Sequence, residues 1–323
     1  MRNTRWLMAV VLVLAAGCCA CNGDGNGTPD PDLFPHVDQS PPLPDFGPWP
    51  DLWPATDGLG KDGPQGAASL IKAVDVQGSA CQDGWAATGT TASASSCSVH
   101  LEAVQLGAGA GAEPDQYGCR IESDKVEAYL YELGCDDKGK ISLACAGSCG
   151  GSGVTRGSVT VPGTSCAGNW QQIASLGSGK SCVAFVGQLK LGVGSGAEPT
   201  TYGCRYDPSS GDVEAYLYEK DCDDKGKIAL RCDWICAPGS SGSYGLDGTQ
   251  CQNSWQPVDA GLAAGKVCVT GIQLMKLGVG SGPEPDFYGC RYDAASGKLQ
   301  AQLFEQDCDD KSIELQCAYL CLE

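Results

Sequence analysis

The chain has 323 residues, including 46 glycines, 21 cysteines and 2 histidines, and a formal net charge of −18. So acidic a balance argues against nucleic acid as a partner, because phosphate binding needs clustered lysine and arginine. With so few histidines, neither a repeated catalytic site nor a zinc site is expected, and we predict that the protein is not an enzyme.

Residues 1–17 have the pattern of an export signal. Two arginines, Arg2 and Arg5, precede an apolar run that is too short to span a bilayer. The run ends in the letters LAAGC, whose last residue is Cys18. This resembles the lipobox of bacterial lipoprotein signal peptides, although Leu14 stands one place before the position that the family prefers.

The resemblance implies that Cys18 carries a thioether-linked lipid, so that the bilayer is a partner and the rest of the chain is extracytoplasmic. Cys19 follows instead of an aspartate, which in that family points to the outer membrane or cell surface. The alternative is an ordinary cleaved signal and a freely secreted protein.

Residues 18–69 are expected to form a disordered tether behind the lipidated cysteine. Within it, residues 22–66 hold ten of the 18 prolines and eight aspartates, without hydrophobic periodicity. Such a stretch cannot bury enough apolar surface to offset the entropy lost on ordering. We therefore predict a semi-rigid spacer between the membrane and the folded part.

A repeat of about 85 residues organises the remainder, and it predicts three modules at 70–149, 155–236 and 242–323. Tryptophans at Trp85, Trp170 and Trp255 mark the period. Each module contains six cysteines at matching positions. The cysteines are Cys81, Cys97, Cys119, Cys135, Cys145 and Cys149; Cys166, Cys182, Cys204, Cys222, Cys232 and Cys236; Cys251, Cys268, Cys290, Cys308, Cys317 and Cys321.

An even number of cysteines at repeated spacing, behind an export signal, indicates disulfide bonds. Modules of this size bury thin cores and usually need covalent cross-links. Six cysteines allow 15 pairings, and spacing alone leaves the choice open. Cysteines four apart, such as Cys232 and Cys236, are too distant along an extended strand to pair with each other.

Each module is predicted to be a small antiparallel β-domain. In the middle module the stretches 159–161, 181–194, 202–207, 213–219 and 227–232 have strand patterns, and 181–194 is apolar at nearly every position, as in a strand covered on both faces. No helical pattern is found. The predicted fold class is all-β: three tandem disulfide-rich modules after a signal peptide and a tether, either independent or modestly packed together.

Acidic pairs in the predicted hairpin before the last strand are candidate calcium ligands, because calcium prefers hard oxygen donors. They are Asp136, Asp137, Asp223, Asp224, Asp309 and Asp310. Polar turn chemistry explains the same residues, since a lysine follows each pair. No other cofactor is expected.

A second candidate site is the outward face of the fourth strand, which carries Glu127, Tyr129, Tyr131, Glu214, Tyr216 and Tyr218. Tyrosine beside an acid suits carbohydrate or a surface protein. The alternative is that these aromatics pack under a neighbouring loop.

Three expectations concern single residues of the modules. Arginines at 120, 205 and 291 should pair with a nearby glutamate, and the repeated tryptophan should cover a disulfide in the core. His100, whose counterparts are Phe185 and Gly271, is expected at the surface or half-buried in a strand.

These patterns together predict a lipid-anchored display protein whose three modules bind or adhere, with avidity from repetition. Two alternatives stay open. One is a structural protein of the cell envelope without a specific ligand, and the other is a secreted protease inhibitor.

Overall fold

The computed structural model describes residues 69–77, 83–106, 115–132, 141–163, 168–191, 200–219, 228–248, 253–258, 262, 266–277, 285–305, 308 and 312–322, with only the backbone of 72–77. These residues form 18 strands, and no helix occurs among them. Every strand pairing among them is antiparallel. The predicted all-β, disulfide-rich class is confirmed.

Each repeat contributes six strands in the same order along the chain. The first repeat forms β1 (Ser69–Gln77), β2 (Ala86–Thr91), β3 (Cys97–Gln105), β4 (Gln116–Glu122), β5 (Lys125–Tyr131) and β6 (Ser142–Cys149). The second forms β7 (Thr155–Pro162), β8 (Gln171–Ser175), β9 (Cys182–Lys190), β10 (Thr201–Asp207), β11 (Asp212–Tyr218) and β12 (Ala229–Cys236). The third forms β13 (Gly239–Asp247), β14 (Gln256–Val258), β15 (Val267–Lys276), β16 (Phe287–Asp293), β17 (Lys298–Phe304) and β18 (Glu314–Leu322).

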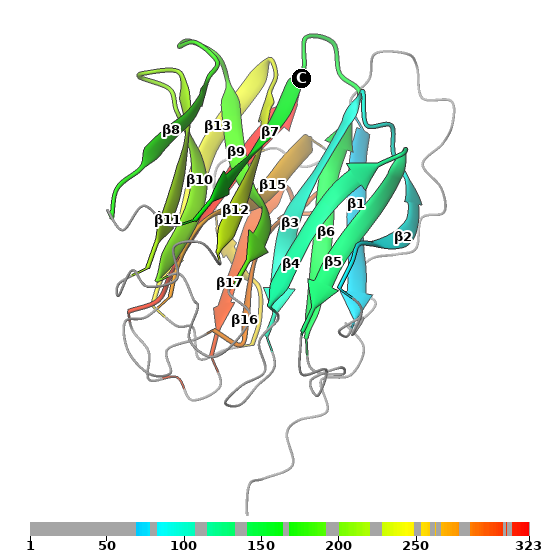
Figure 1. Cartoon of the computed structure of the whole chain (residues 1–323). Helices are drawn as coiled ribbons and strands as arrows, with labels where there is room; N and C mark the ends of the chain where they lie inside the picture. Colours follow the sequence, from blue (N-terminus) through cyan, green and yellow to red (C-terminus); the bar gives the residue numbers. More distant parts are fainter. Residues whose placement is uncertain are drawn as a thin grey trace, which may run out of the picture. The chain divides into compact units, whose positions relative to one another are not determined.

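Every sheet is shared between two repeats (Figure 1). The strand orders are β1-β6-β3-β16-β17-β14, β2-β5-β4-β9-β12-β7 and β13-β18-β15-β10-β11-β8, which we call sheets A, B and C. Each repeat therefore gives its first, third and sixth strands to one sheet and its second, fourth and fifth to another. This differs from modules that stand side by side, because no repeat holds a complete sheet of its own.

Three equivalent junctions join the repeats into a closed cycle. Tyr117 on β4 pairs with Leu189 on β9, Tyr202 on β10 with Met275, and Tyr288 on β16 with Val104 on β3. The third junction connects the last repeat back to the first. The matching registers relate the repeats by a pseudo-threefold axis, although the chain is a single polypeptide.

The central strands β3, β9 and β15 are covered on both faces, as the apolar sequence of residues 181–194 predicts for the middle one. Val186 of β9 belongs to the main core, which extends through all three repeats, together with Leu101 and Ile272. Its neighbour Phe185 points the other way, into a second apolar cluster. The three strands also contact one another, so the second face lies at the pseudo-threefold axis.

The axis is also occupied by three buried tyrosine hydroxyls. The hydroxyl of Tyr117 lies 3.0 Å from that of Tyr202 and 2.8 Å from that of Tyr288, which is 2.8 Å from Tyr202. Each hydroxyl can donate once and accept once, so a closed ring satisfies all three. Burial raises the pKa of Tyr117 well above its usual value and that of Tyr202 to about 12, which keeps these hydroxyls protonated.

Six disulfides among the described residues brace the repeats in two ways. Cys97–Cys149, Cys182–Cys236 and Cys268–Cys321 join neighbouring strands of one sheet. Cys119–Cys145, Cys204–Cys232 and Cys290–Cys317 link two different sheets. Cys308 is disulfide-bonded as well. The prediction that Cys232 and Cys236 have separate partners is confirmed, and each loop closure contributes about 3–4 kcal/mol in the chain-entropy model.

Candidate functional site

The outward face of each sheet carries a cluster built from one repeat, which we call the Trp–Arg cluster. It combines the tryptophan before the second strand, the arginine of the fourth strand and three alternate residues of the fifth. The clusters are Trp85, Arg120, Glu127, Tyr129 and Tyr131 on sheet B; Trp170, Arg205, Glu214, Tyr216 and Tyr218 on sheet C; Trp255, Arg291, Gln300, Gln302 and Phe304 on sheet A.

Alternation along the fifth strand brings the predicted binding residues together. On β11 the side chains of Val213 and Ala215 are buried in the core, whereas Glu214, Tyr216 and Tyr218 are half-buried. Neighbouring side chains on a strand point to opposite faces of a sheet. The three half-buried residues therefore share the outward face.

An ion pair and a stacked ring lie at the centre of each cluster on sheets B and C. Arg120 pairs with Glu127 at 2.8 Å, and Arg205 with Glu214 at 2.6 Å, so the predicted pairing of these arginines is confirmed. The guanidinium carbons of Arg120 and Arg205 each lie 4.3 Å from the centroid of a tryptophan ring. Because the glutamate fixes one edge of the guanidinium, its flat face stays on the indole.

The tryptophans are half-buried and not inside the core as expected, whereas the cysteines whose disulfide they were predicted to cover, Cys81, Cys166 and Cys251, lie outside the described residues. Trp170 is half-buried on the outward face under Arg205, rather than inside the buried core. The sequence carried a usable signal, since an arginine after the cysteine and a tryptophan recur in all three repeats. Local spacing could not show that the two residues stack, because they lie on segments that meet only in the folded sheet.

The first aromatic residue of the fifth strand contacts the residues just before the tryptophan. Tyr129 donates a hydrogen bond to Asp83, and a Cβ added to Gly168 would lie 3.0 Å from the Tyr216 hydroxyl. Tyr129 is 5% exposed, so little of its surface is free. The second aromatic, Tyr131 or Tyr218, remains half-buried and is the more accessible ring.

Sheet A carries a changed version of the cluster. Arg291 donates to the neutral Gln300 at 2.5 Å, and Gln302 donates to Asn253 at 2.6 Å. The guanidinium of Arg291 still lies over Trp255, at 4.2 Å from the ring centroid. Burial lowers the pKa of Arg291, and the charges of Glu102 and Asp293 oppose that shift. The third repeat therefore has no acid on β17, and the negative charges that act on Arg291 come from Glu102 of the first repeat and from Asp293.

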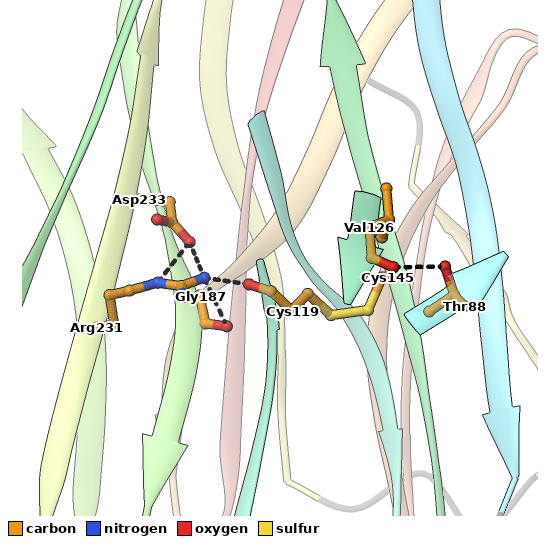
Figure 2. The surroundings of a disulfide bond; sticks show 7 residues. All are labelled: Thr88, Cys119, Val126, Cys145, Gly187, Arg231 and Asp233. Carbon is orange, nitrogen blue, oxygen red and sulfur yellow. Dashed lines mark hydrogen bonds and ion pairs between the residues drawn. A yellow bond between two sulfur atoms is a disulfide. The ribbon is translucent and has the colours of Figure 1, made fainter. Parts of the chain in front are cut away.

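A second charged pair lies where sheet B passes from the first repeat to the second (Figure 2). Arg231 of β12 contacts Asp233 at 2.9 Å and donates to the carbonyl of Cys119 on β4. Burial raises the pKa of Asp233, and Arg231 opposes the shift. A Cβ on Gly187 would collide with the Asp233 carboxylate, so glycine is needed to admit the pair.

His100 is buried at the axis, not at the surface or half-buried as expected. It is 1% exposed, its ring stacks on Phe185 at 4.1 Å, and its Nε2 donates to the Thr270 carbonyl at 2.7 Å. A Cβ at the third equivalent position, Gly271, would lie 2.5 Å from the imidazole. Burial lowers the pKa of His100 to about 4. This histidine therefore fills space and is no candidate base.

The remaining predicted site residues fall outside the described part of the chain. They are Cys18, Asp136, Asp137, Asp223, Asp224, Asp309 and Asp310. Within the described residues no cluster of histidine, cysteine and acidic side chains is suited to a metal ion. The described residues also contain no helix long and apolar enough to cross a membrane.

Comparison with known proteins adds no family. The chain matches no protein-family profile, and no curated protein shows significant sequence similarity to it. The disulfide-rich all-β architecture is nevertheless typical of proteins that fold in an oxidising, extracytoplasmic compartment. This architecture is consistent with a secreted or surface protein.

Proposed function

We propose that the protein is a lipid-anchored surface protein that binds carbohydrate through its Trp–Arg clusters, without catalysing a reaction. The observation that supports this most is the repetition of one outward-facing cluster around the pseudo-threefold axis. A half-buried aromatic ring next to a fixed ion pair offers a stacking surface for a sugar ring and charged partners for its hydroxyls. Repetition within one chain adds avidity for a polymeric glycan.

The two intact clusters, on sheets B and C, are the proposed binding sites. Both keep a glutamate on the arginine and a half-buried tyrosine at the end of the strand, Tyr131 or Tyr218. On sheet A these positions hold Gln300 and Phe304, which lack the charge and the hydroxyl. Sheet A is therefore expected to bind the same ligand weakly.

The test is binding of the mature, detergent-solubilised protein to arrays of glycans and of cell-surface proteins. Substitution of Tyr131 and Tyr218 together by alanine should weaken glycan binding about tenfold or more, since accessible aromatic anchors carry much of the affinity at such sites. Phe304→Ala is the matched control and should change it less than twofold. Binding to neither array would favour a structural envelope protein, and binding to proteins alone would replace carbohydrate as the ligand.

Anchoring is tested separately from ligand binding. Cells grown with a labelled fatty acid should incorporate the label into the wild-type protein, and Cys18→Ser should abolish that labelling. A variant that remains labelled and membrane-bound would show that another residue is the anchor.

A further inference from the structure

The first repeat is joined to the rest of the molecule by contacts that resemble a subunit interface. Two of the three strand junctions involve it: β4 pairs with β9 of the second repeat, and β3 pairs with β16 of the third. Leu191 donates its backbone N–H to Asp115 beside one junction, and Leu106 donates to Asp286 beside the other. Each of the six disulfides described lies within one repeat.

The side chains of this interface are those of a buried protein–protein contact. His100 inserts against Phe185 of the second repeat and hydrogen-bonds to Thr270 of the third. Tyr117 completes the ring of hydroxyls with Tyr202 and Tyr288. Apolar and aromatic groups therefore meet at the centre with their polar atoms satisfied, as in stable interfaces.

The polar contacts differ between the two junctions, so they distinguish the first repeat from the others. Arg231 of the second repeat reaches the Cys119 carbonyl, whereas Glu102 of the first repeat supplies negative charge to Arg291 of the third. The counterparts of His100 are Phe185 and Gly271. An imidazole facing a glycine fits only one arrangement of the three repeats.

We propose that this junction is a protein–protein interface in its own right, and that the first repeat of a second copy of the chain can occupy it. A first repeat from a second copy would use the same contacts that join the repeats within one chain, so no new kind of interaction is needed. Among the residues that the structure describes, the only covalent link between the first two repeats is the joint after Cys149, in which Ser152 and Gly153 are exposed. A break or opening there frees the first repeat to pair with another molecule, as in domain exchange.

The test begins with the full-length protein carrying a specific protease site inserted between Gly151 and Ser152. After folding and cleavage, the nicked protein should elute from a sizing column as the uncut protein does. A denaturing gel without reductant should then separate two fragments, because no described disulfide crosses the joint. Fragments that part on the sizing column, or that stay linked on the gel, would overturn the proposal.

Exchange is then measured by mixing nicked protein labelled with heavy isotopes with an unlabelled preparation in mild denaturant, followed by dilution. Native mass spectrometry should find hybrids in about half of the complexes, the fraction that random pairing gives. Arg231→Ala should speed the exchange at least tenfold, because its partner carbonyl belongs to the first repeat. If that variant does not fold, Tyr117→Phe should speed it several-fold.

Glu122→Gln is the matched control, because this exposed residue lies at the far end of β4 from Tyr117. It should leave the exchange rate unchanged within twofold. The absence of hybrids at every denaturant concentration that leaves the protein able to refold would show that the first repeat cannot be supplied by another chain.

Discussion

The hydrogen-bonded ring of three tyrosine hydroxyls at the axis shows how single atoms couple the three repeats. The dipeptide tyrosine–glycine recurs in all three repeats, and the hydroxyls of its tyrosines lie within 3.0 Å of one another. Their hydrogen bonds form only if all three repeats are docked. The ring therefore stabilises the assembly of the repeats, and no repeat alone can satisfy its own hydroxyl in this way.

Substituting the ring tyrosines by phenylalanine should give strongly non-additive effects. A single change, Tyr202→Phe, leaves a buried hydroxyl without its full set of partners and should lower the free energy of unfolding by about 1–2 kcal/mol. The triple change of Tyr117, Tyr202 and Tyr288 leaves no hydroxyl unsatisfied and should cost no more than about 2 kcal/mol. Denaturant titration of the oxidised chain measures both. Three equal, additive losses would show that the hydroxyls act independently.

His100 gives the stability a pH dependence of known sign. Its folded pKa of about 4 lies below the usual value of 6.5 for histidine, so the folded state disfavours the protonated form. The neutral imidazole's contribution is complete above pH 6.5 and is lost as the pH falls to about 4. A shift of this size corresponds to roughly 3 kcal/mol.

The measurement compares wild type with His100→Gln, whose amide can still donate to the Thr270 carbonyl. Carboxylates titrate in both proteins, so the difference between their unfolding free energies isolates the histidine. Between pH 7 and pH 4 the free energy of unfolding of the wild type should fall by about 3 kcal/mol more than that of the variant. Parallel curves over this range would mean that the imidazole does not resist protonation.

At the scale of strands, the glycine that follows each of the three axis tyrosines determines how closely two repeats approach. On Gly118 an added Cβ would lie 2.6 Å from the Cβ of Gln188, across the junction between β4 and β9. Gly203 and Gly289 are equally crowded by Gln273 and Ala103. No positive φ is involved at these positions, so close approach of the neighbouring strand is what requires glycine.

Gly118→Ala should therefore lower the free energy of unfolding by about 1–3 kcal/mol, because β4 and β9 must move apart to admit the methyl group. Gly84→Ala is the matched control, since nothing lies within 4 Å of an added Cβ there. It should change stability by less than about 0.5 kcal/mol. Chemical denaturation measures the free energy of unfolding of both variants. Equal effects would mean that the junction can accommodate a methyl group.

Strands were easier to predict from the sequence than their partners. Alternation identified the two faces of β11, and the apolar run identified β9 as covered on both sides. The sheets could not be predicted, because each junction rests on three residue pairs between different repeats. Nothing in the local pattern distinguishes a strand partner in the same repeat from one in the next.

The candidate site was predicted in part for the same reason. The shared face of Glu214, Tyr216 and Tyr218 follows from strand periodicity, and the pairing of Arg205 with Glu214 follows from their charges. The stacking of Arg205 on Trp170 depends on a tertiary contact that spacing does not reveal. The position of His100 likewise depends on the size of its counterparts, Phe185 and Gly271, at an axis that cannot be predicted from the sequence.

For the whole molecule, sharing of sheets should make unfolding a single event despite the threefold repeat. Unfolding one repeat would remove half of two sheets and expose the axis faces of β3, β9 and β15. The penalty falls on the two repeats that remain, so partly unfolded states are disfavoured. The described residues of all three repeats fall within one compact unit.

Calorimetry of the oxidised protein can measure this coupling directly. One cooperative transition gives a calorimetric enthalpy equal to the van't Hoff enthalpy, whereas three independent modules of similar stability would give a ratio of about three. We expect a ratio near one under conditions where unfolding is reversible. Gly118→Ala lies at a single junction, yet it should move the whole transition to lower temperature rather than split it. A separate early peak in that variant would show that the repeats melt independently.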